Sequence, residues 1–195
     1  MFLFEPEEIE KATRTIQKFK TQKTEDEIFY NLCFCILVPQ SRFKNILNIV
    51  ENLKQLQFKT QWVDLENVIK DSRFKFRKGQ FLLDMKKNFD SFYISLKNIL
   101  ESNAESREKR KFIVDNVKGI GLKTASQFLR NMGVDDLAII DTHILKHMGL
   151  TKKFNYIEVE DKIRDAAKTL EISVAVLDAI IWSKNSKVQE ENFIY

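Results

Sequence analysis

Glycine and proline are scarce in this chain, which has five Gly and two Pro among 195 residues. Because these residues form most of the tight turns between short strands, their scarcity disfavours a β sandwich or barrel. Apolar residues instead recur at i, i+3 and i+4 along most of the chain, which is the spacing of amphipathic helices. This spacing predicts an all-α protein. The chain has 44% hydrophobic residues, which is enough for a core, so we expect one compact unit, residues 1–195.

Cysteine and histidine are scarce as well, with two of each. Cys33 and Cys35 are two positions apart in an apolar run, which is not the CxxC spacing of a redox or zinc pair. The common iron–sulfur clusters need four thiolates, and the histidines add no zinc-ligand pattern. We therefore expect two buried thiols, no iron–sulfur cluster and no required cofactor.

Long apolar runs are also missing. No stretch approaches the roughly 18 to 20 apolar residues of a membrane-spanning helix, and the N-terminus MFLFEPEEIE turns acidic within five residues. These features predict a cytoplasmic, nucleoid-associated protein, with a monomer as the default state. The 32 Lys+Arg against 28 Asp+Glu leave a net charge of +4, a weak basic excess that suits nucleic acid but also many unrelated proteins.

Capping signals and apolar periodicity place the predicted helices. Thr24 and Glu27 have the spacing of a capping box, and the helix that they open ends near Pro39. Ser41 is the expected N-cap of a second helix, and a third, at about 81–89, follows the segment RFKFRKGQF. Further helices are predicted at about 102–116, 122–132, 142–149, 156–170 and 173–184.

Two of the five glycines form the turn GIG at 119–121, between two helical patterns. A Gly-x-Gly turn that opens a helix leaves amide groups pointing outward, and the helix dipole adds positive charge, so the turn favours a phosphate. A corner that needs glycine for geometry alone is the alternative. The alternating apolar residues and the KTA that begins the second helix favour a helix-hairpin-helix DNA-binding element at about 112–132. The expected phosphate-binding residues are Gly119, Gly121, Lys118 and Thr124.

Asp141 stands between an apolar pair and a helical pattern in the segment IIDTHI, eighteen residues after Lys123. Taken alone, an aspartate at this point is a good helix N-cap. A glycine hairpin with a lysine in the next turn, followed eighteen residues later by Asp-Thr-His, is much less expected by chance than the aspartate alone. Lys123 and Asp141 are therefore the candidate catalytic residues.

The segments VKGIGLKTA at 117–125 and IDTH at 140–143 resemble the endonuclease III superfamily of helix-hairpin-helix DNA glycosylases. The absence of four cysteines points away from its iron–sulfur branches. The chain looks most like the type-2 8-oxoguanine DNA glycosylase/lyases of archaea and some bacteria, through FCILVPQS, RFKFRKGQF and AIIWSKNSK. The resemblance covers most of residues 25–188 and implies a helix-hairpin-helix glycosylase fold, with two helical lobes and a cleft between them.

The resemblance also implies a reaction. Lys123 matches the lysine that forms a covalent Schiff base in bifunctional members, and Asp141 matches the aspartate that supports the chemistry. The implied function is removal of 8-oxoguanine from double-stranded DNA, followed by strand cleavage through β-elimination. The alternatives are a non-catalytic DNA-binding module and a glycosylase for another damaged base. A third alternative, a glycosylase that uses activated water, is disfavoured by Lys123.

Further site residues depend partly on this resemblance. Gln40, near the end of ILVPQS, is expected to enter the gap left by the extruded base. Phe76 or Phe81 with Trp182 are candidates for the flat faces of a purine pocket, with a core role as the alternative for each. The family often ends in a lysine that helps to recognise the damaged base, whereas this chain continues as VQEENFIY, which leaves its damage specificity open. A monovalent cation is implied at the carbonyls of Asp115, Val117 and Ile120.

Charge gives a last set of expectations. Imine formation needs a neutral amine, whereas a free lysine, with a pKa of about 10.4, is almost fully charged at neutral pH. We therefore expect Lys123 to be buried in a closed pocket, and Asp141, at a helix N-terminus, to stay charged. The basic and aromatic residues at 73–78 are expected near the DNA strand, and the basic cluster at 107–111 on an exposed helix face.

Overall fold

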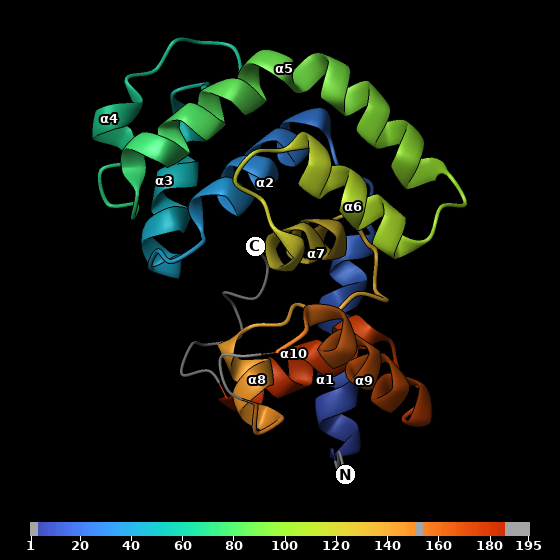
Figure 1. The fold of residues 1–195 in the computed structure, drawn as a ribbon. Coiled ribbons are helices and arrows are strands. Elements are labelled where there is room, and N and C mark those ends of the chain that lie inside the picture. Colours follow the sequence, from blue (N-terminus) through green and yellow to red (C-terminus); the bar gives the residue numbers. More distant parts are fainter. Residues whose placement is uncertain (1–3, 151–153, 186–195) are drawn as a thin grey trace. The chain divides into compact units, whose positions relative to one another are not determined.

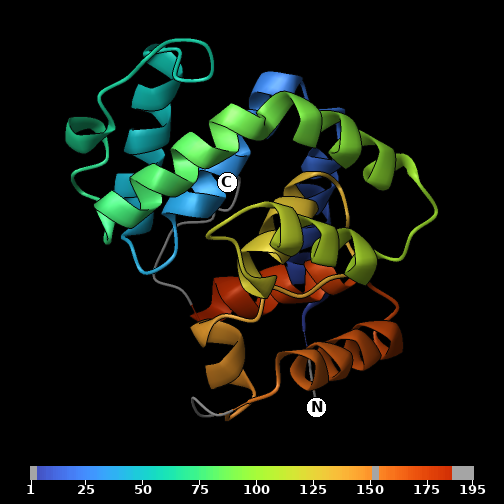
Figure 2. The same cartoon turned by 45° about the horizontal axis from the view of Figure 1, so that its top comes forward.

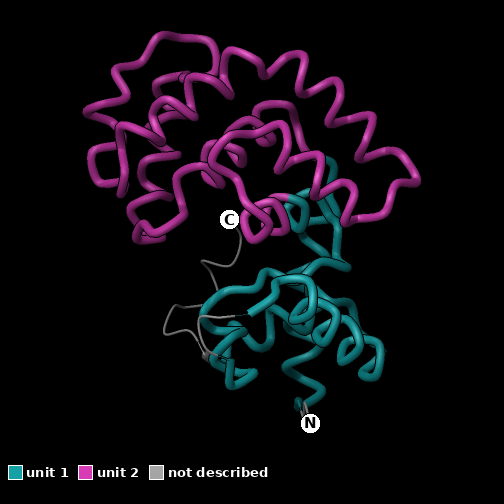
Figure 3. Tube along the Cα trace, in the orientation of Figure 1, with its two compact units in different colours: residues 1–22, 129–194 teal, residues 23–128, 195 magenta. Residues whose placement is uncertain are grey.

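The computed structural model describes residues 4–150 and 154–185, and every regular element within these ranges is a helix (Figure 1). The predicted all-α fold is therefore confirmed. The chain divides into two compact units (Figure 3). We call residues 23–128 the central unit, and residues 4–22, 129–150 and 154–185 the terminal unit.

The central unit is arranged around a long helix, α5. Its helices are α2 (Glu25–Leu37), α3 (Phe43–Gln55), α4 (Leu65–Val68), α5 (Lys75–Glu101), α6 (Ser106–Asn116) and the start of α7 (Leu122–Asn131). Helix α5 runs across α2 in both views of the fold (Figures 1 and 2) and packs against it. Helix α3 packs on α2, and α6 contacts α5. The helix before the predicted hairpin therefore rests on the main helix of the unit.

Helix α2 begins at the capping box that the sequence predicts. Thr24 Oγ1 accepts a hydrogen bond from the Glu27 amide at 3.2 Å, and the Glu27 carboxylate accepts one from the Thr24 amide at 2.7 Å. The helix is buried on nearly every side, and Phe29 meets the Phe89 ring of α5 edge-on with centroids 4.9 Å apart. Both cysteines lie in this helix as buried thiols, as expected.

Two predicted features of the central unit are wrong. Helix α5 has 27 residues and begins at Lys75, so most of RFKFRKGQF forms its first turns instead of preceding the helix. Buried residues from Leu82 to Leu96 give this helix an apolar face well beyond the predicted end. Ser41 does not cap α3, because Arg42 is the N-cap residue and makes no side-chain capping bond.

The terminal unit is built around α10. Its elements are α1 (Pro6–Gln17), a 3-10 turn at Lys18–Lys20, the end of α7, α8 (Thr142–His147), α9 (Tyr156–Thr169) and α10 (Val174–Asn185). Leu177 and Ile181 of α10 pack into an apolar cluster with α8 and α9, whereas Val176 and Ile180 pack with α1. A helix that is apolar on several faces is suited to the interior of a unit, which is the position that α10 takes.

Helix α1 is absent from the predicted helices. Ile9, Ala12 and Ile16 give it a narrow apolar stripe, which does not stand out among its charged residues. Its start is nevertheless well defined, since Glu5 and Glu8 form a capping box. Among the residues that the structure describes, no helix combines the length and the apolar composition that crossing a membrane requires.

Candidate active site

The predicted hairpin joins α6 and α7 through residues 117–121. Val117 and Ile120 are buried, and Gly119 between them has a φ of +88°, which an L side chain rarely adopts. The hydrogen bonds of α7 begin with the Ala125 amide, which donates to the Gly121 carbonyl at 2.9 Å. The amides before Ala125 lie in the first turn, where the helix offers them no acceptor and anions are favoured.

Lys123 lies in this first turn of α7, and its side chain is exposed. The expected burial of this lysine in a closed pocket is therefore wrong for the chain without DNA. The hairpin places Nζ where a large substrate has access to it.

A buried arginine links the two helices of the hairpin. Arg110 on α6 is 1% exposed, and its Nη1 donates to Ser126 Oγ on α7 at 3.0 Å. The sequence places it on an exposed basic face, so this expectation is wrong for Arg110. Its neighbour Lys111 is exposed and pairs with Asp115 at 2.6 Å. The buried link thus joins α6 to α7, the helix whose first turn carries Lys123.

The hydroxyl of Thr124, expected to bind phosphate, is used within the hairpin. Its Oγ1 accepts a hydrogen bond from the Gly121 amide at 3.1 Å and donates one to the Gly121 carbonyl at 3.2 Å. The residue is buried, and such local bonds from a threonine stabilise the start of a helix. Thr124 therefore shapes the turn, and its own contact with phosphate stays a prediction.

Helix α5 braces the hairpin through two contacts. The Phe81 ring lies so close to Gly119 that a Cβ atom there would be 2.5 Å from ring carbon Cδ2. The Lys118 ammonium pairs with the Asp84 carboxylate at 2.8 Å, with both side chains largely exposed. Phe81, a candidate for the base pocket, thus has a packing role, and a phosphate would compete with Asp84 for Lys118.

Asp141 caps α8 in the terminal unit. Its Oδ1 accepts hydrogen bonds from the His143 and Ile144 amides at 2.8 and 3.0 Å, so the predicted N-cap role is confirmed. Both bonds use one oxygen atom, which means that the cap does not depend on Oδ2. Trp182, a base-pocket candidate, lies on α10 with its ring centroid 6.2 Å from that of His143, in an edge-on contact.

Gln40 and Phe76 are exposed in the central unit. Gln40 has a positive φ of 57° in the turn after α2. Phe76 is 71% exposed with the Lys75 ammonium 5.1 Å from its ring centroid. Phe74, in the same basic and aromatic segment, is 54% exposed with the Arg73 guanidinium 4.9 Å from its ring centroid. Exposed rings paired with cations suit stacking on bases beside phosphates.

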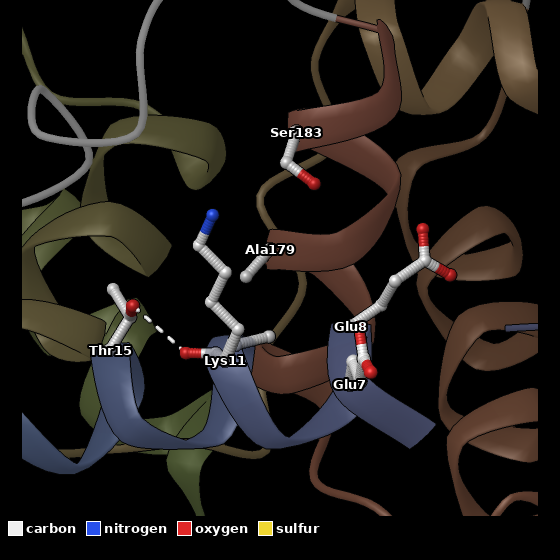
Figure 4. A pocket seen from close by; sticks show the side chains of 7 residues that line it. Glu7, Glu8, Lys11, Thr15, Ala179 and Ser183 are labelled. Carbon is white, nitrogen blue, oxygen red and sulfur yellow. Dashed lines mark hydrogen bonds between the residues drawn. The ribbon is translucent and has the colours of Figure 1, made fainter. Parts of the chain in front are cut away.

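A pocket of about 230 Å³ opens between α1 and α10 in the terminal unit (Figure 4). Its lining includes Glu7, Glu8, Lys11, Thr15, Ala179 and Ser183. None of the predicted site residues lines it, and the Glu8 carboxylate is held by Lys184 at 2.8 Å. Thr15 donates to the Lys11 carbonyl within the same helix. We assign this pocket no role in the chemistry of the hairpin.

An all-helical chain in which a glycine hairpin presents a lysine in the first turn of its second helix, followed by an aspartate-capped helix, has the features of a helix-hairpin-helix DNA glycosylase. Residues 9–172 match a family model described as 8-oxoguanine DNA glycosylase. The chain belongs to the 8-oxoguanine DNA glycosylase family, which confirms the resemblance seen in its sequence.

Relatives match over most of the chain. The 8-oxoguanine DNA glycosylase/AP lyase of Methanocaldococcus jannaschii is 31% identical over 183 residues, which cover 87% of this chain and 86% of the relative. A protein of the same name from Fusobacterium nucleatum is 33% identical over 180 residues, covering 85% and 82%. The crystal structure of the M. jannaschii 8-oxoguanine glycosylase/lyase in complex with a 15mer DNA containing 8-oxoguanine aligns with a TM-score of 0.77 at 28% identity, over 94% of this chain and 98% of that chain.

Proposed function

We propose that the chain is a bifunctional enzyme that excises 8-oxoguanine from double-stranded DNA and then cleaves the strand at the resulting site. The observation that carries this function is the exposed Lys123 in the first turn of α7, directly after a hairpin turn suited to phosphate. Family membership and relatives named 8-oxoguanine DNA glycosylase/AP lyase support it.

The reaction starts with extrusion of the damaged nucleotide, because C1′ is inaccessible inside a stacked duplex. The neutral Lys123 amine attacks C1′; the N–C1′ bond forms while the bond to the base breaks, and the base leaves with the electron pair and takes up a proton. The amine then loses a proton, the sugar ring opens at O4′, which is protonated, and an iminium forms. Loss of the C2′ proton expels the 3′ phosphate and cleaves the strand.

Asp141 assists in one of two ways. The negative charge of its carboxylate would stabilise the positive charge that grows on the sugar as the base leaves. It would alternatively accept a proton from the Lys123 ammonium. Because Oδ1 holds both capping amides, we assign the chemistry to Oδ2.

The bound DNA completes the environment of Lys123. The amine is exposed in the free chain, whereas attack on C1′ requires its neutral form. Contact with an extruded nucleotide would remove water from Nζ and thereby disfavour the ammonium form. We therefore assign the shielding of Lys123 to the substrate.

Phosphate binding falls to the hairpin. The first-turn amides of α7 and the turn at Gly119 face the backbone of the DNA, and Lys118 adds a positive charge. The Gly121 amide is already bonded to Thr124, so the amides that follow it carry the contact. These contacts fix the position of the strand without reading its sequence.

A monovalent cation beside this phosphate is the one bound ion that we propose, at the carbonyls of Asp115, Val117 and Ile120. Carbonyl oxygens at the end of α6 suit a cation because the helix dipole is negative there. The Val117 carbonyl accepts a hydrogen bond from the Ile120 amide at 3.3 Å and keeps a second lone pair. Replacing K⁺ with tetramethylammonium at equal ionic strength should weaken DNA binding, and unchanged affinity would rule this ion out.

Borohydride trapping tests the function directly. The purified chain is incubated with a duplex carrying one 8-oxoguanine, and in parallel with duplexes carrying uracil, thymine glycol or an abasic site. A covalent adduct with 8-oxoguanine DNA supports the proposal. An adduct with another lesion alone keeps the chemistry and changes the substrate, and no adduct with any duplex favours a DNA-binding module without catalysis.

Paired variants identify the nucleophile. Lys123→Gln should abolish the adduct and strand cleavage while DNA binding persists. Lys118→Gln is the matched control, because it removes the same charge from the same hairpin and should weaken binding without preventing the adduct. Asp141→Asn should slow base release with little loss of fold, since asparagine also caps helices. Strand cleavage by the Lys123→Gln variant would move the nucleophile elsewhere.

We further propose that the enzyme works as a monomer on chromosomal DNA in the cytoplasm. Contacts with phosphates release counterions, so the logarithm of the binding constant should fall linearly with the logarithm of salt concentration. Sedimentation of the chain with a short duplex should give a one-to-one complex. A salt-independent affinity would contradict DNA binding of any kind.

A further inference from the structure

Lys78, near the start of α5, is a buried lysine that the reaction above does not use. It is 5% exposed, which contradicts its expected place in a basic segment beside the DNA strand. Its three N–H groups lie within hydrogen-bonding distance of four oxygen atoms in total. They are the carbonyls of Leu37 at 2.6 Å and Pro39 at 2.7 Å, and the hydroxyls of Ser41 at 3.0 Å and Ser72 at 3.3 Å.

These oxygen atoms belong to two separate segments of the central unit. Leu37 ends α2, and Pro39 lies in the turn at 38–41, whereas Ser72 precedes α5. Ser41 adds a further link, because its Oγ accepts a hydrogen bond from the Arg73 amide at 3.0 Å. One ammonium group thus ties the end of α2 and the turn at 38–41 to the segment before α5.

The turn at 38–41 is closed by the Ser41 amide, which donates to the Val38 carbonyl at 3.1 Å. Pro39 is its second residue, and Gln40 is its third, with a φ of 57°. This is the pattern of a type II turn, in which glycine usually takes the third position. Glutamine is strained there, and its side chain is exposed. Such a residue is typical of a functional surface, where the side chain has a task.

The ammonium group supplies hydrogen-bond donors, which an apolar side chain of similar size lacks. Burial of a charge is unfavourable, and it lowers the pKa of Lys78 to about 8. In return the group offers three donors, which bind carbonyls and hydroxyls of two segments at once. The geometry fixed in this way is that of the turn that presents Gln40.

We propose that Lys78 is a positioning residue of base excision, which holds the turn at 38–41 so that the Gln40 side chain is ready to enter the space left by the extruded nucleotide. The inference rests on the proposed function and concerns a residue that touches neither substrate nor reacting atoms. Without the ammonium group the turn samples other conformations, and Gln40 has to be ordered during each extrusion. A group misplaced by about 1 Å costs up to about 100-fold in rate.

A double-mutant cycle tests whether Lys78 acts through Gln40. The single-turnover rate of 8-oxoguanine release from a duplex is measured for the wild type, Lys78→Met, Gln40→Ala and the double variant. Each single change should slow release by about 10- to 100-fold. If Lys78 works by placing Gln40, the double variant is no slower than the slower single variant. If the double variant is slower by the product of the two single effects, the proposal is overturned.

Lys86→Met is the matched control for the charge and the helix. Lys86 also lies on α5, and its Nζ also donates to a backbone carbonyl, that of Gln61 at 2.5 Å. In a cycle with Gln40→Ala, the double variant should be slower by the product of the two single effects, because the Gln61 carbonyl lies outside the turn at 38–41. Coupling of equal size for Lys86 and Lys78 would show a general effect of charge on α5 and would also overturn the proposal.

A second substrate separates positioning from folding. When 8-oxoguanine faces an abasic analogue instead of cytosine, extrusion is easier because the damaged base is unpaired. The defect of Lys78→Met should shrink on this duplex, whereas a folding defect would be equal on both. If Lys78→Met does not fold, Ser41→Ala removes one oxygen of the same network and should show the same contrast at smaller size. Failure of the wild type to release any base refutes the proposed function instead.

Discussion

The ring of Phe81 on α5 lies directly against Gly119 in the hairpin, where a Cβ atom would be 2.5 Å from Cδ2, 3.0 Å from Cε2 and 3.2 Å from Cγ. Gly119 also has a φ of +88°. The glycine is therefore required twice, once for the backbone conformation and once for the approach of the ring. Gly121, two residues on, has no atom within 4 Å of such a Cβ position.

Gly119→Ala should destabilise the chain by about 3 kcal/mol, because the left-handed conformation costs roughly 1–2 kcal/mol and the clash with Phe81 adds a similar amount. Gly121→Ala is the control and should change stability by less than about 1 kcal/mol. Urea unfolding of the two variants gives both values. Equal losses would mean that the Phe81 contact does not restrict Gly119.

The hairpin was predictable because its signals are local. Glycine in the turn, the apolar residues around it and the lysine after it lie within one short stretch, and the capping box of α2 is equally local. The N-cap formed by Asp141 was predictable for the same reason. A cap and its helix are neighbours in sequence, so their pattern survives without knowledge of the fold.

Arg110 and Lys78 were misplaced because their partners are distant in sequence. Arg110 bonds a residue 16 positions away, and Lys78 bonds a carbonyl 41 positions away. A charged residue in a basic run is expected to be exposed, unless the hydrogen-bond acceptors that compensate its burial are known. Lys123 differs in the opposite sense: the chemistry of the reaction predicts a shielded amine, whereas its surroundings in the free chain leave it exposed.

Arg110→Met should destabilise the chain by about 3 kcal/mol, since it leaves the buried hydroxyl of Ser126 without this partner and disturbs a packed helix contact. Lys111→Met, one residue on, removes an exposed ion pair with Asp115 and should cost less than about 1 kcal/mol. Thermal and urea unfolding provide the comparison. Because α7 carries Lys123, the Arg110 variant should also trap less DNA adduct per folded molecule, and normal trapping would show that the link does not orient that lysine.

Gln40→Gly should separate stability from activity. The substitution removes the strain of a non-glycine residue at a φ of 57°, which stabilises the folded chain by roughly 1–2 kcal/mol. It also gives the unfolded chain more conformational entropy, which destabilises the fold and offsets most of this gain. Stability should therefore change by less than about 1 kcal/mol, while base release slows by about tenfold or more because the side chain that we propose to fill the gap is lost.

Gln57→Gly is the matched control, because Gln57 is exposed with a φ of 50° and lies outside the proposed site. The same substitution in the same backbone conformation should have a comparable effect on the free energy of unfolding and none on base release. Slower release in the Gln57 variant would attribute the effect to added glycine flexibility, whereas unchanged release in the Gln40 variant would remove Gln40 from the mechanism.

The pH dependence of stability should reveal the buried ammonium of Lys78. Burial lowers its pKa from 10.5 to about 8 in the folded chain. Between these two pH values the folded chain has released the proton and the unfolded chain still holds it, so the free energy of unfolding rises with pH. For a pKa difference of this size the rise is about 3 kcal/mol, complete near pH 10.5.

Other groups act in the opposite direction over the same range, so the raw curve is not diagnostic. Burial raises the pKa of the Cys33 thiol and of Tyr30, and the unfolded chain therefore releases their protons first, which lowers stability as pH rises. The difference between wild type and Lys78→Met cancels these contributions. This difference should increase in favour of the wild type by about 3 kcal/mol from pH 7 to pH 10.5. A difference that stays flat would mean that Lys78 keeps its ordinary pKa in the folded chain, and that its four oxygen partners stabilise the ammonium form enough to offset the cost of burial.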